Sequence, residues 1–473
     1  MPKILPITLF TLMSGSAFAS ITVDQYLETV KRQNLSFQSS ETQIEGAALQ
    51  KREADLFFTP QFFFNAQSGY DSKLLSPPFL VYDQVKNDRI SAGVSQEFSF
   101  GLQARFSYDL VKTEYEGLDL GPGKPNPYWD AIPTLELTIP LWGNGFGRTS
   151  QARRELTLQQ RTFEQYSASA QAKRTLVQAE VAYWRLSAAQ ESVEVQNKAL
   201  KAAREILDYV TVKRNKNLGE EADVLQAKAL TEAYRLQLEQ AEIEERTARR
   251  NYNLFLNVDA DAPVAKLSRL DYKKLSELVV PDTRPGDRPD VTASKAQVAL
   301  ARASSKLAAE QNKPTLDLYG GYSLFGRDKK TSGAISDAGY PDRDSGYIGV
   351  RFNMPLNISA QMDARKGANQ IERAAEMNHR YLTYAQDQEW TDLTSLVRDA
   401  QTSLKLAQSM EKAQKAKLDN ERTRLRQGRT TTYQVLLFEQ DYLSAEISRI
   451  RAASQIINLN SQIQLYSASE EGK

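Results

Sequence analysis

Apolar and polar residues alternate almost without interruption between positions 91 and 110, and this period of two predicts β-strands with one apolar face. The apolar residues keep the same parity on both sides of Gly101. A two-residue turn at Gly101 would exchange that parity, whereas a three-residue loop over residues 99–101 preserves it and favours glycine at its left-handed position. One uninterrupted strand would preserve the parity as well. The pattern therefore leaves a hairpin or a single long strand.

The strand count favours the hairpin. Residues 61–70 and 132–141 also have strand patterns, and helical patterns flank the whole region 61–141. If both flanking helices lie at the same end of the sheet, the number of strands between them must be even, and only the hairpin gives an even number, four. Two further strands, about 315–325 and 346–354, are predicted in the region 315–354, joined by a polar loop over residues 326–345. The prediction is therefore six strands in all.

Long helices are predicted on either side of the strands. Apolar residues recur every seven positions in two series, which are Val181, Ala188, Val195, Ala202, Tyr209 and Leu436, Leu443, Ile450, Ile457. A strict seven-residue repeat predicts left-handed supercoiling against partner helices, and the alanines permit close approach. The spacing of Thr22 and Gln25 predicts a capping box at the start of the first helix.

The same order of elements occurs twice along the chain. The landmarks are Pro60, Pro140 and Gly219 in the first copy and Pro314, Pro355 and Gly428 in the second. About 75 residues separate the later proline from the glycine in each copy, enough for a helix of roughly 100 Å. We therefore divide the chain into a first repeat over residues 20–256, with a helical hairpin over 148–256, a connector over 257–288, and a second repeat over 289–473, with a helical hairpin over 357–467.

The N-terminus predicts export. Residues 1–19 have the pattern of a secretory signal peptide, with Lys3, a short apolar run and an Ala-x-Ala cleavage site. No later stretch has the roughly 20 apolar residues of a membrane-spanning helix. We expect an exported protein whose attachment to a membrane, if it has one, depends on its fold.

Composition argues against most chemistry. Cysteine is absent and His379, expected on a helix surface, is the only histidine, so thiol nucleophiles and His/Cys metal sites are excluded. The 60 Lys and Arg residues balance 59 Asp and Glu residues, which argues against nucleic-acid binding. The glycine-rich residues 143–147 lack the spacing of a nucleotide-binding loop and are better explained as a turn from strand to helix. We predict no enzyme activity, no catalytic residue, no metal and no cofactor.

These features resemble the outer-membrane efflux protein family, the TolC-like channel-tunnels. The resemblance covers essentially the whole chain after the signal peptide. It rests on Ile139-Pro140-Leu141-Trp142-Gly143 and its fainter copy Met354-Pro355-Leu356, on the hairpin sequences that begin at Gly219 and Gln427, and on Arg288-Pro289-Asp290 at the start of the second repeat.

The resemblance implies a mainly α-helical chain with a β-barrel part, built from duplicated helix–strand–helix halves. It implies a homotrimer whose barrel lies in the outer membrane and continues as a long α-helical barrel in the periplasm. Physical reasoning agrees, because the strands of one chain are too few to close a barrel and lipid does not tolerate open sheet edges. The family usually contributes four strands per chain. The six predicted here suggest a wider barrel, or alternatively an extra hairpin that forms an extracellular flap.

The two hairpin ends are the predicted closure of the tunnel. We expect Asp223 to pair with Arg426 or Arg429, each exposed pair contributing about 0–1 kcal/mol, although ordinary solvated turn charges are an alternative. The resemblance also implies an acidic ring after the second glycine, but Gln434 and Leu437 occupy those positions. The predicted gate residues are Asp223, Arg424, Arg426, Arg429, Tyr433 and Gln434.

Two further sets of residues are predicted to have a role. Residues implied by the resemblance to meet a periplasmic adaptor are Leu218, Gly219, Glu220, Glu221 and Gly428. Residues expected at the junctions of barrel and helices are Pro60, Pro140, Trp142, Gly143, Gly145, Pro314 and Pro355.

The function implied by the resemblance is a passive exit duct in the outer membrane. Its partners would be the other two copies, outer-membrane lipid, a periplasmic adaptor and an inner-membrane transporter. Two alternatives stay open, a type I protein-secretion channel and a soluble periplasmic coiled-coil scaffold.

Overall fold

The computed structural model describes residues 20–72, 82–117 and 126–466, so the predicted signal peptide lies outside the described residues. Contacts divide the chain into two compact units. The sheet unit consists of Gln43–Ser167 and Val291–Leu382, and the helical unit consists of Met1–Thr42, Ala168–Asp290 and Thr383–Lys473. Each unit takes segments from both predicted repeats, and the division of the chain into repeats stays a prediction.

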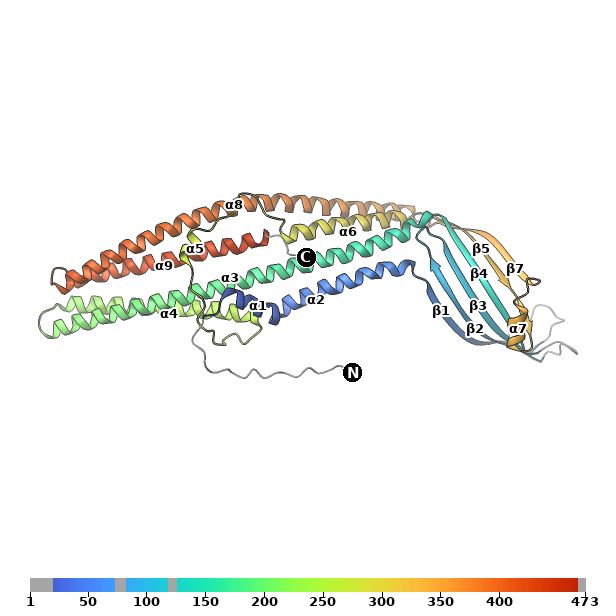
Figure 1. Cartoon of the computed structure of the whole chain (residues 1–473), viewed down its shortest axis with the longest axis horizontal. Helices are drawn as coiled ribbons and strands as arrows, with labels where there is room; N and C mark the ends of the chain where they lie inside the picture. The colour runs from blue at the N-terminus through green and yellow to red at the C-terminus, as the bar shows by residue number, and fades with distance from the viewer. Residues whose placement is uncertain (1–19, 73–81, 118–125, 467–473) are drawn as a thin grey trace. The chain divides into compact units, whose positions relative to one another are not determined.

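The sheet unit contains one antiparallel sheet with the strand order β1-β2-β3-β4-β5-β7 (Figure 1). A short strand, β6, pairs with β4 outside this order. The six long strands predicted from the sequence are therefore present, and all six join the same sheet. Their bounds are β1 Gln61–Asp71, β2 Gln84–Glu97, β3 Gln103–Glu116, β4 Tyr128–Trp142, β5 Thr315–Leu324, β6 Gly326–Asp328 and β7 Asp344–Asn353.

The turn between β2 and β3 is the predicted three-residue loop. Phe98 N–H donates to the Leu102 carbonyl at 2.8 Å and Gly101 N–H donates to the Phe98 carbonyl at 2.8 Å. Gly101 has φ 94°, the left-handed conformation that glycine adopts without strain. Residues of equal parity pair across the hairpin, for example Val94 with Phe106. Both strands extend beyond the alternating region, where Lys86 pairs with Glu114 in the ladder and forms a diagonal ion pair with Glu116.

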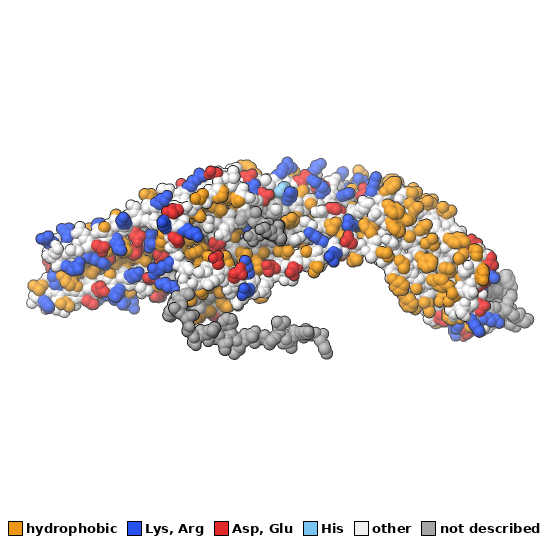
Figure 2. All heavy atoms as spheres, in the orientation of Figure 1, with side chains coloured by type: hydrophobic (Ala, Val, Ile, Leu, Met, Phe, Trp, Pro, Cys, Tyr) orange, Lys and Arg blue, Asp and Glu red, His pale blue; other side chains and the backbone are white. Residues whose placement is uncertain are grey.

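The sheet has one apolar and one polar face. Exposed apolar side chains lie on one face of all six long strands, and Figure 2 shows such side chains gathered over the visible part of the sheet. The side chains on this face with at least two-fifths of their area exposed include Phe62, Phe64, Ile90, Val94, Phe106, Leu135, Ile139, Tyr322, Ile348, Val350 and Phe352. The other face carries polar pairs, including Arg89 with Asp109 at 3.0 Å and Thr134 with Ser323 at 2.9 Å.

The segment between β5 and β7 is not the irregular loop that the sequence predicted. It contains β6 and a short helix, α7 Thr331–Asp337, which packs on the apolar face of the sheet. Ala334 and Ala338 contact Ala131, and Tyr108, Leu110 and Trp129 surround them. The prediction missed α7 because seven residues give too little periodicity to distinguish a helix turn from a loop.

The helices match the predicted ranges closely. The sheet unit contains η1 Lys51–Phe58 and all but the first two residues of α6 Pro289–Gln311. The helical unit contains α1 Val23–Gln33, α4 Glu221–Leu256, α5 Tyr272–Ser276, α9 Thr432–Ile463 and η3 Gln464–Tyr466. Three helices contribute to both units, and these are α2 Leu35–Gln50, α3 Arg148–Asn215 and α8 Ile358–Arg426. The capping box of Thr22 and Gln25 is confirmed. With 68 and 69 residues, α3 and α8 are each about 100 Å long.

The core of the helical unit follows the predicted seven-residue series on α9, whereas in the series on α3 Ala188 and Val195 are buried but Tyr209 is 44% exposed. Leu443, Ile450 and Ile457 of α9 are buried against α3, α4 and α8, and Leu436 joins a smaller cluster with Val210. A second cluster stacks the rings of Tyr26 and Tyr252, whose centroids are 4.2 Å apart. None of the described helices is apolar enough over a sufficient length to cross a bilayer.

The connector is held against the helical unit. Leu267 pairs with Ile21 in a parallel bridge, and Leu267 and Leu270 are buried. At the end of the connector the Arg288 guanidinium donates to Asp290 at 2.8 and 2.6 Å and also bonds Glu389. These contacts give the Arg288-Pro289-Asp290 motif a structural role, because they tie the start of α6 to α8.

Candidate functional site: hairpin ends and strand–helix junctions

The first helical hairpin turns at Asn217. The N–H of Leu218 donates to the Lys213 carbonyl and the N–H of Asn217 donates to the Arg214 carbonyl, both at 2.9 Å, which is the Schellman arrangement. Asn217 has φ 52° and holds the left-handed position. The sequence predicted glycine at the turn, but Gly219 lies two residues later, where a Cβ would come within 3.3 Å of Arg214 N. Gly219 therefore permits close approach, and Asn217 makes the turn.

The second helical hairpin repeats this arrangement at Gly428. The N–H of Arg429 donates to the Arg424 carbonyl at 2.9 Å, the N–H of Gly428 donates to the Leu425 carbonyl at 3.0 Å, and Gly428 has φ 71°. Thr431 then caps α9, its hydroxyl accepting from the Gln434 N–H at 3.4 Å. The two ends share one backbone motif, as the repeated sequence pattern suggested.

A buried carboxylate fixes the second end. Glu421 of α8 is 5% exposed, and its carboxylate accepts hydrogen bonds from the Thr430 hydroxyl and from Arg424 Nη1, the latter at 3.1 Å. Arg424 also donates to the Arg429 carbonyl at 3.4 Å. Arg424, predicted as a gate residue, is therefore occupied within its own hairpin.

The other predicted gate residues do not meet within one chain. Among the described residues, no ion pair joins Asp223 to Arg426 or Arg429; Arg426 donates instead to the Thr423 hydroxyl at 3.2 Å. Tyr433 is 49% exposed and Gln434 serves the cap of α9. A pair between Asp223 and an arginine of another copy stays a prediction.

Glu439 is a buried carboxylate that sequence reasoning missed. It lies on α9 beside Arg422, whose Nε donates to it at 3.0 Å. Burial raises the pKa of Glu439 above its ordinary value, and Arg422 opposes that shift. Glu439 stands three residues after Leu436 and four before Leu443, both buried. An acid inside an apolar stripe was the signal that could have identified it.

The predicted docking residues are accessible. Leu218 is 68% exposed, and Leu225, one turn into α4, is 59% exposed. Glu221 pairs with Arg214 at 2.7 Å on the surface. Beside the second hairpin, a groove is lined by α3 residues that include Ile206 and by Arg426 of α8.

The strand–helix junctions are built from closely packed backbone. Pro60 follows η1 and precedes β1, and Pro314 precedes β5. Gly143 has φ 84°, and a Cβ there would lie 3.0 Å from the Pro314 carbonyl oxygen. Pro140 and Trp142 flank a bulge where β4 pairs with β5. Pro140, Trp142, Gly143 and Pro314 therefore lie together, whereas Pro60 precedes the edge strand β1 and Pro355 follows the end of β7.

The start of α3 is held by Asn144. Its side-chain oxygen accepts from the N–H groups of Thr149 at 2.8 Å and Ser150 at 3.1 Å, and its amide donates to Glu97 at 3.3 Å. Gly145 and Gly147 lie in the short helix η2 Gly145–Gly147, and Gly147 has φ 73°. The glycines of residues 143–147 therefore serve the turn from strand to helix, as predicted.

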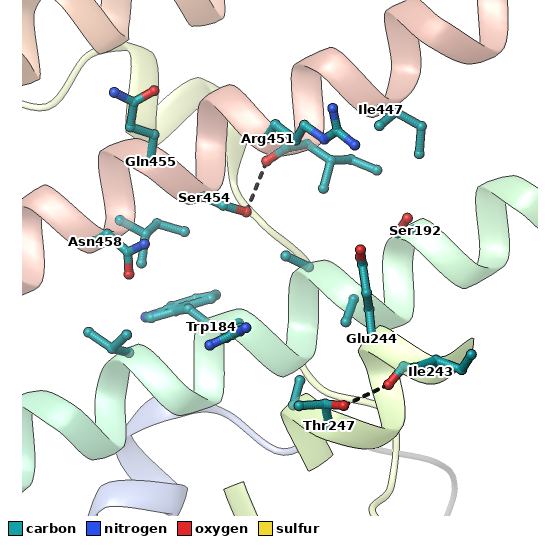
Figure 3. A pocket seen from close by; sticks show the side chains of 17 residues that line it. Trp184, Ser192, Ile243, Glu244, Thr247, Ile447, Arg451, Ser454, Gln455 and Asn458 are labelled. Carbon is teal, nitrogen blue, oxygen red and sulfur yellow. Dashed lines mark hydrogen bonds between the residues drawn. The ribbon is translucent and has the colours of Figure 1, made fainter. Parts of the chain in front are cut away.

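The helical unit contains a groove whose polar side chains do not point toward a common point. It is lined by side chains of α3, α4 and α9, including Trp184, Ile243 and Ile447 (Figure 3). The hydrogen bonds there stay within single helices, from the Thr247 hydroxyl to the Ile243 carbonyl and from the Ser454 hydroxyl to the Ile450 carbonyl. The described residues contain no group of His, Cys, Asp and Glu able to hold a metal ion. Arg185, Glu244 and Arg451 also line the groove, but among the described residues no hydrogen bond joins polar side chains of different helices there, and we assign the groove no ligand.

Comparison with solved structures finds the same arrangement elsewhere. The outer membrane protein VceC of Vibrio cholerae is 14% identical, and the match covers 95% of this chain and 97% of that chain with a TM-score of 0.66. The MtrE outer membrane channel of Neisseria gonorrhoeae is 14% identical over 94% of this chain and 88% of that chain, with a TM-score of 0.65. The CmeC outer membrane channel of Campylobacter jejuni is 14% identical over 99% and 95%, with a TM-score of 0.64. No family model and no curated protein matches the sequence.

Proposed function

We propose that this chain, which has the fold of these outer-membrane channels, is the outer-membrane duct of a tripartite efflux system. Three copies would join their sheets into one barrel in the outer membrane, and their long helices would continue it as a tunnel in the periplasm. An adaptor protein and an inner-membrane transporter would deliver the substrate, and the duct would conduct it passively.

The observation that carries the proposal is the division of the sheet into an apolar and a polar face. From Leu102, which precedes β3, to Leu110 in β3, every second residue lies on the apolar face, which then changes to Lys112 and Glu114. Nine residues at about 3.4 Å, tilted by about 35°, give a band of roughly 25 Å, the height expected of an outer-membrane barrel. A soluble sheet of this extent would not leave such a band exposed.

The polar face supports a water-filled lumen. Arg89 pairs with Asp109, and the Tyr347 hydroxyl donates to Glu136 at 3.2 Å, all on the face opposite Phe106 and Leu135. Charged side chains on an inner barrel face are solvated by the channel, whereas the same side chains toward lipid would be strongly unfavourable.

The hairpin ends suit the periplasmic end of the duct. They carry the exposed Leu218 and Leu225 for contact with an adaptor and the charged residues Asp223, Arg426 and Arg429 for closure. Each is presented by a rigid Schellman turn, so contacts between copies would have a defined geometry.

Fractionation and conductance test the proposal. The full chain, expressed with its signal peptide, should be recovered from the outer membrane only with detergent, migrate as an SDS-resistant trimer and form conducting pores in planar bilayers. Release as a soluble protein without detergent, together with absence of pores, would overturn the proposal in favour of a periplasmic scaffold.

A further inference from the structure

Two strands end the sheet. In the part of the chain that the structure describes, β1 pairs only with β2 and β7 pairs only with β5, so each presents one open edge (Figure 1). An open edge carries unpaired N–H and C=O groups, which are costly in lipid. Both edges therefore need a strand partner if the sheet crosses a membrane.

We propose that β7 of one copy pairs antiparallel with β1 of the next copy, in the register that places Phe62 opposite Phe352. The occupant of each edge is a second copy of this chain, and in the proposed trimer the result is a barrel of eighteen strands. The inference rests on the proposed function, but the register itself follows from the sheet.

The first restriction on the register comes from the two faces. Phe62 and Phe64 of β1 pair with Val94 and Ala92 and so lie on the apolar face. Phe352 and Val350 of β7 lie on the same face, since they pair with Leu316 and Leu318. Because a slip by one residue turns every side chain to the other face, only registers that join residues of equal parity keep the apolar band continuous.

The second restriction comes from the stagger of the strands. Following the paired residues across the sheet from Gln61 at the start of β1 leads through Ser95, Arg105, Glu136 and Gly321 to Tyr347. Tyr347 lies six residues before Asn353, the end of β7. If Asn353 meets Gln61 of the next copy, six residues at about 3.3 Å over six strands at about 4.8 Å give a tilt of about 35°.

Neighbouring registers fit less well. A shift by two residues in one direction reduces the tilt to about 25°, below the range of about 35–45° for membrane barrels. A shift by two in the other direction gives about 42°, but it places Pro355, which has no N–H group, opposite Gln61. The proposed register instead pairs all ten residues of β7, from Asp344 to Asn353, with residues of β1.

The polar face agrees with this register. It places Arg351 opposite Phe63. Arg351 already lies 4.7 Å from the centroid of the Tyr319 ring, and Arg105 lies 4.6 Å from that of Phe63. The row of alternating guanidinium groups and aromatic rings would then continue across the boundary between copies.

The pairing of β7 with β1 of the next copy, here called the seam, fixes the number of strands in the barrel and so the width of the duct. Barrel diameter rises roughly in proportion to strand number, and barrels of 16–18 strands enclose an open aqueous channel. With six strands per copy, the eighteen-stranded barrel would enclose a water-filled lumen wider than a hydrated small solute. This width comes from the additional hairpin in the first half of the chain.

Cysteine cross-linking in membranes tests the seam, because the chain has no cysteine of its own. The test pairs are Ala66→Cys with Ile348→Cys and Gln67→Cys with Tyr347→Cys, since adjacent antiparallel pairs alternate between narrow and wide spacing. The register controls are Ala66→Cys with Val350→Cys and Ala66→Cys with Gly346→Cys. After oxidation, at least one test pair should yield on the order of tenfold more covalent trimer than either control, because a disulfide cannot bridge Cα atoms more than about 7 Å apart.

Three other outcomes would overturn the proposed pairing of β7 with β1. Each can be distinguished from failure of the proposed channel function. Stronger cross-linking in a control pair shows another register, and a bond within a single chain shows that one copy closes on itself. Conducting, SDS-resistant trimers that cross-link at none of these pairs show that β7 and β1 pair in neither the proposed register nor its two neighbours. Absence of trimers and pores in the parent protein would instead contradict the proposed function.

Discussion

The backbones of Gly101 and Gly147 are in close contact at the end of the sheet that meets α3. A Cβ on Gly101 would come within 2.6 Å of Gly147 N, and a Cβ on Gly147 would come within 2.8 Å of Gly101 N. Both residues have positive φ, 94° and 73°. The turn between β2 and β3 is thereby seated against the start of α3, and Gln151 Nε2 adds a hydrogen bond to the Ser99 carbonyl at 2.7 Å.

Replacement of Gly147 should loosen this junction. Gly147→Ala adds a Cβ 2.2 Å from the Ser99 carbonyl oxygen in a backbone conformation that alanine rarely adopts. We expect a loss of about 2–4 kcal/mol in stability, from backbone strain and overpacking together. Thermal unfolding of the detergent-solubilised protein, followed by circular dichroism, measures the loss. Gly145→Ala is the matched control, because its Cβ would have no neighbour closer than 3.9 Å; equal losses in both variants would contradict the explanation.

The contacts of Arg288 predict a second effect. Its side chain is 17% exposed and bonds Asp290 at two points as well as Glu389. Arg288→Lys keeps the charge but loses the bidentate geometry, and we expect about 2 kcal/mol of destabilisation. Arg302→Lys, whose side chain is 65% exposed beside Glu372 and Glu376, should change stability by about 0–1 kcal/mol. Thermal unfolding followed by circular dichroism compares the two; a larger loss in Arg302→Lys would refute the assignment.

The strands and hairpins could be predicted because their signals are local. The parity on either side of Gly101 determines the loop length, and the buried series from Leu436 to Ile457 repeats every seven residues. Each signal depends on spacing within one element, where backbone geometry alone fixes which side chains share a face.

The details of the site depend on contacts that spacing does not encode. Asn217 makes the first hairpin turn because α3 ends at Asn215, two residues before it. Gly219, the residue type more usual in turns, lies two residues after Asn217. The pairing of Glu421 with Thr430 brings together residues on either side of a turn. α7 is stable because Ala131 of another strand covers it. In each case the deciding contact comes from outside the local pattern.

Burial of Glu439 predicts that the second hairpin is more stable in mild acid. The pKa of Glu439 in the folded protein is raised, chiefly by burial, so the folded state binds more protons than the unfolded state above the ordinary pKa of the group. Stability from this group therefore decreases as pH rises through that window and is recovered on acidification. Hydrogen exchange of residues 432–443 between about pH 5 and pH 7 measures the change.

Two variants isolate this effect from other titrating groups. Glu439→Gln should flatten the pH dependence of exchange, because the side chain stays polar beside Arg422 but no longer titrates. Asp441→Asn, which removes an exposed pair with Lys417, should leave the dependence as in the parent protein. An unchanged pH dependence in Glu439→Gln would assign it to the other charged groups near Glu439, which are Asp419, Arg422 and Glu446.

Charge at the hairpin ends predicts how the proposed duct would be held closed. Within one chain Arg424 is occupied by Glu421, whereas the Arg429 side chain has no ion pair among the described residues, which leaves Arg429 available to Asp223 of a neighbouring copy. Each such pair contributes about 0–1 kcal/mol, and three related copies would hold the tip shut yet allow it to open. Asp223→Ala should therefore raise the open fraction in planar bilayers several-fold.

Glu220→Ala removes a neighbouring charge outside the pair and should leave the open fraction unchanged. Restoration of closure by the charge exchange Asp223→Arg with Arg429→Asp would identify the partner, and equal currents in Asp223→Ala and the parent protein would exclude a role for Asp223 in closure.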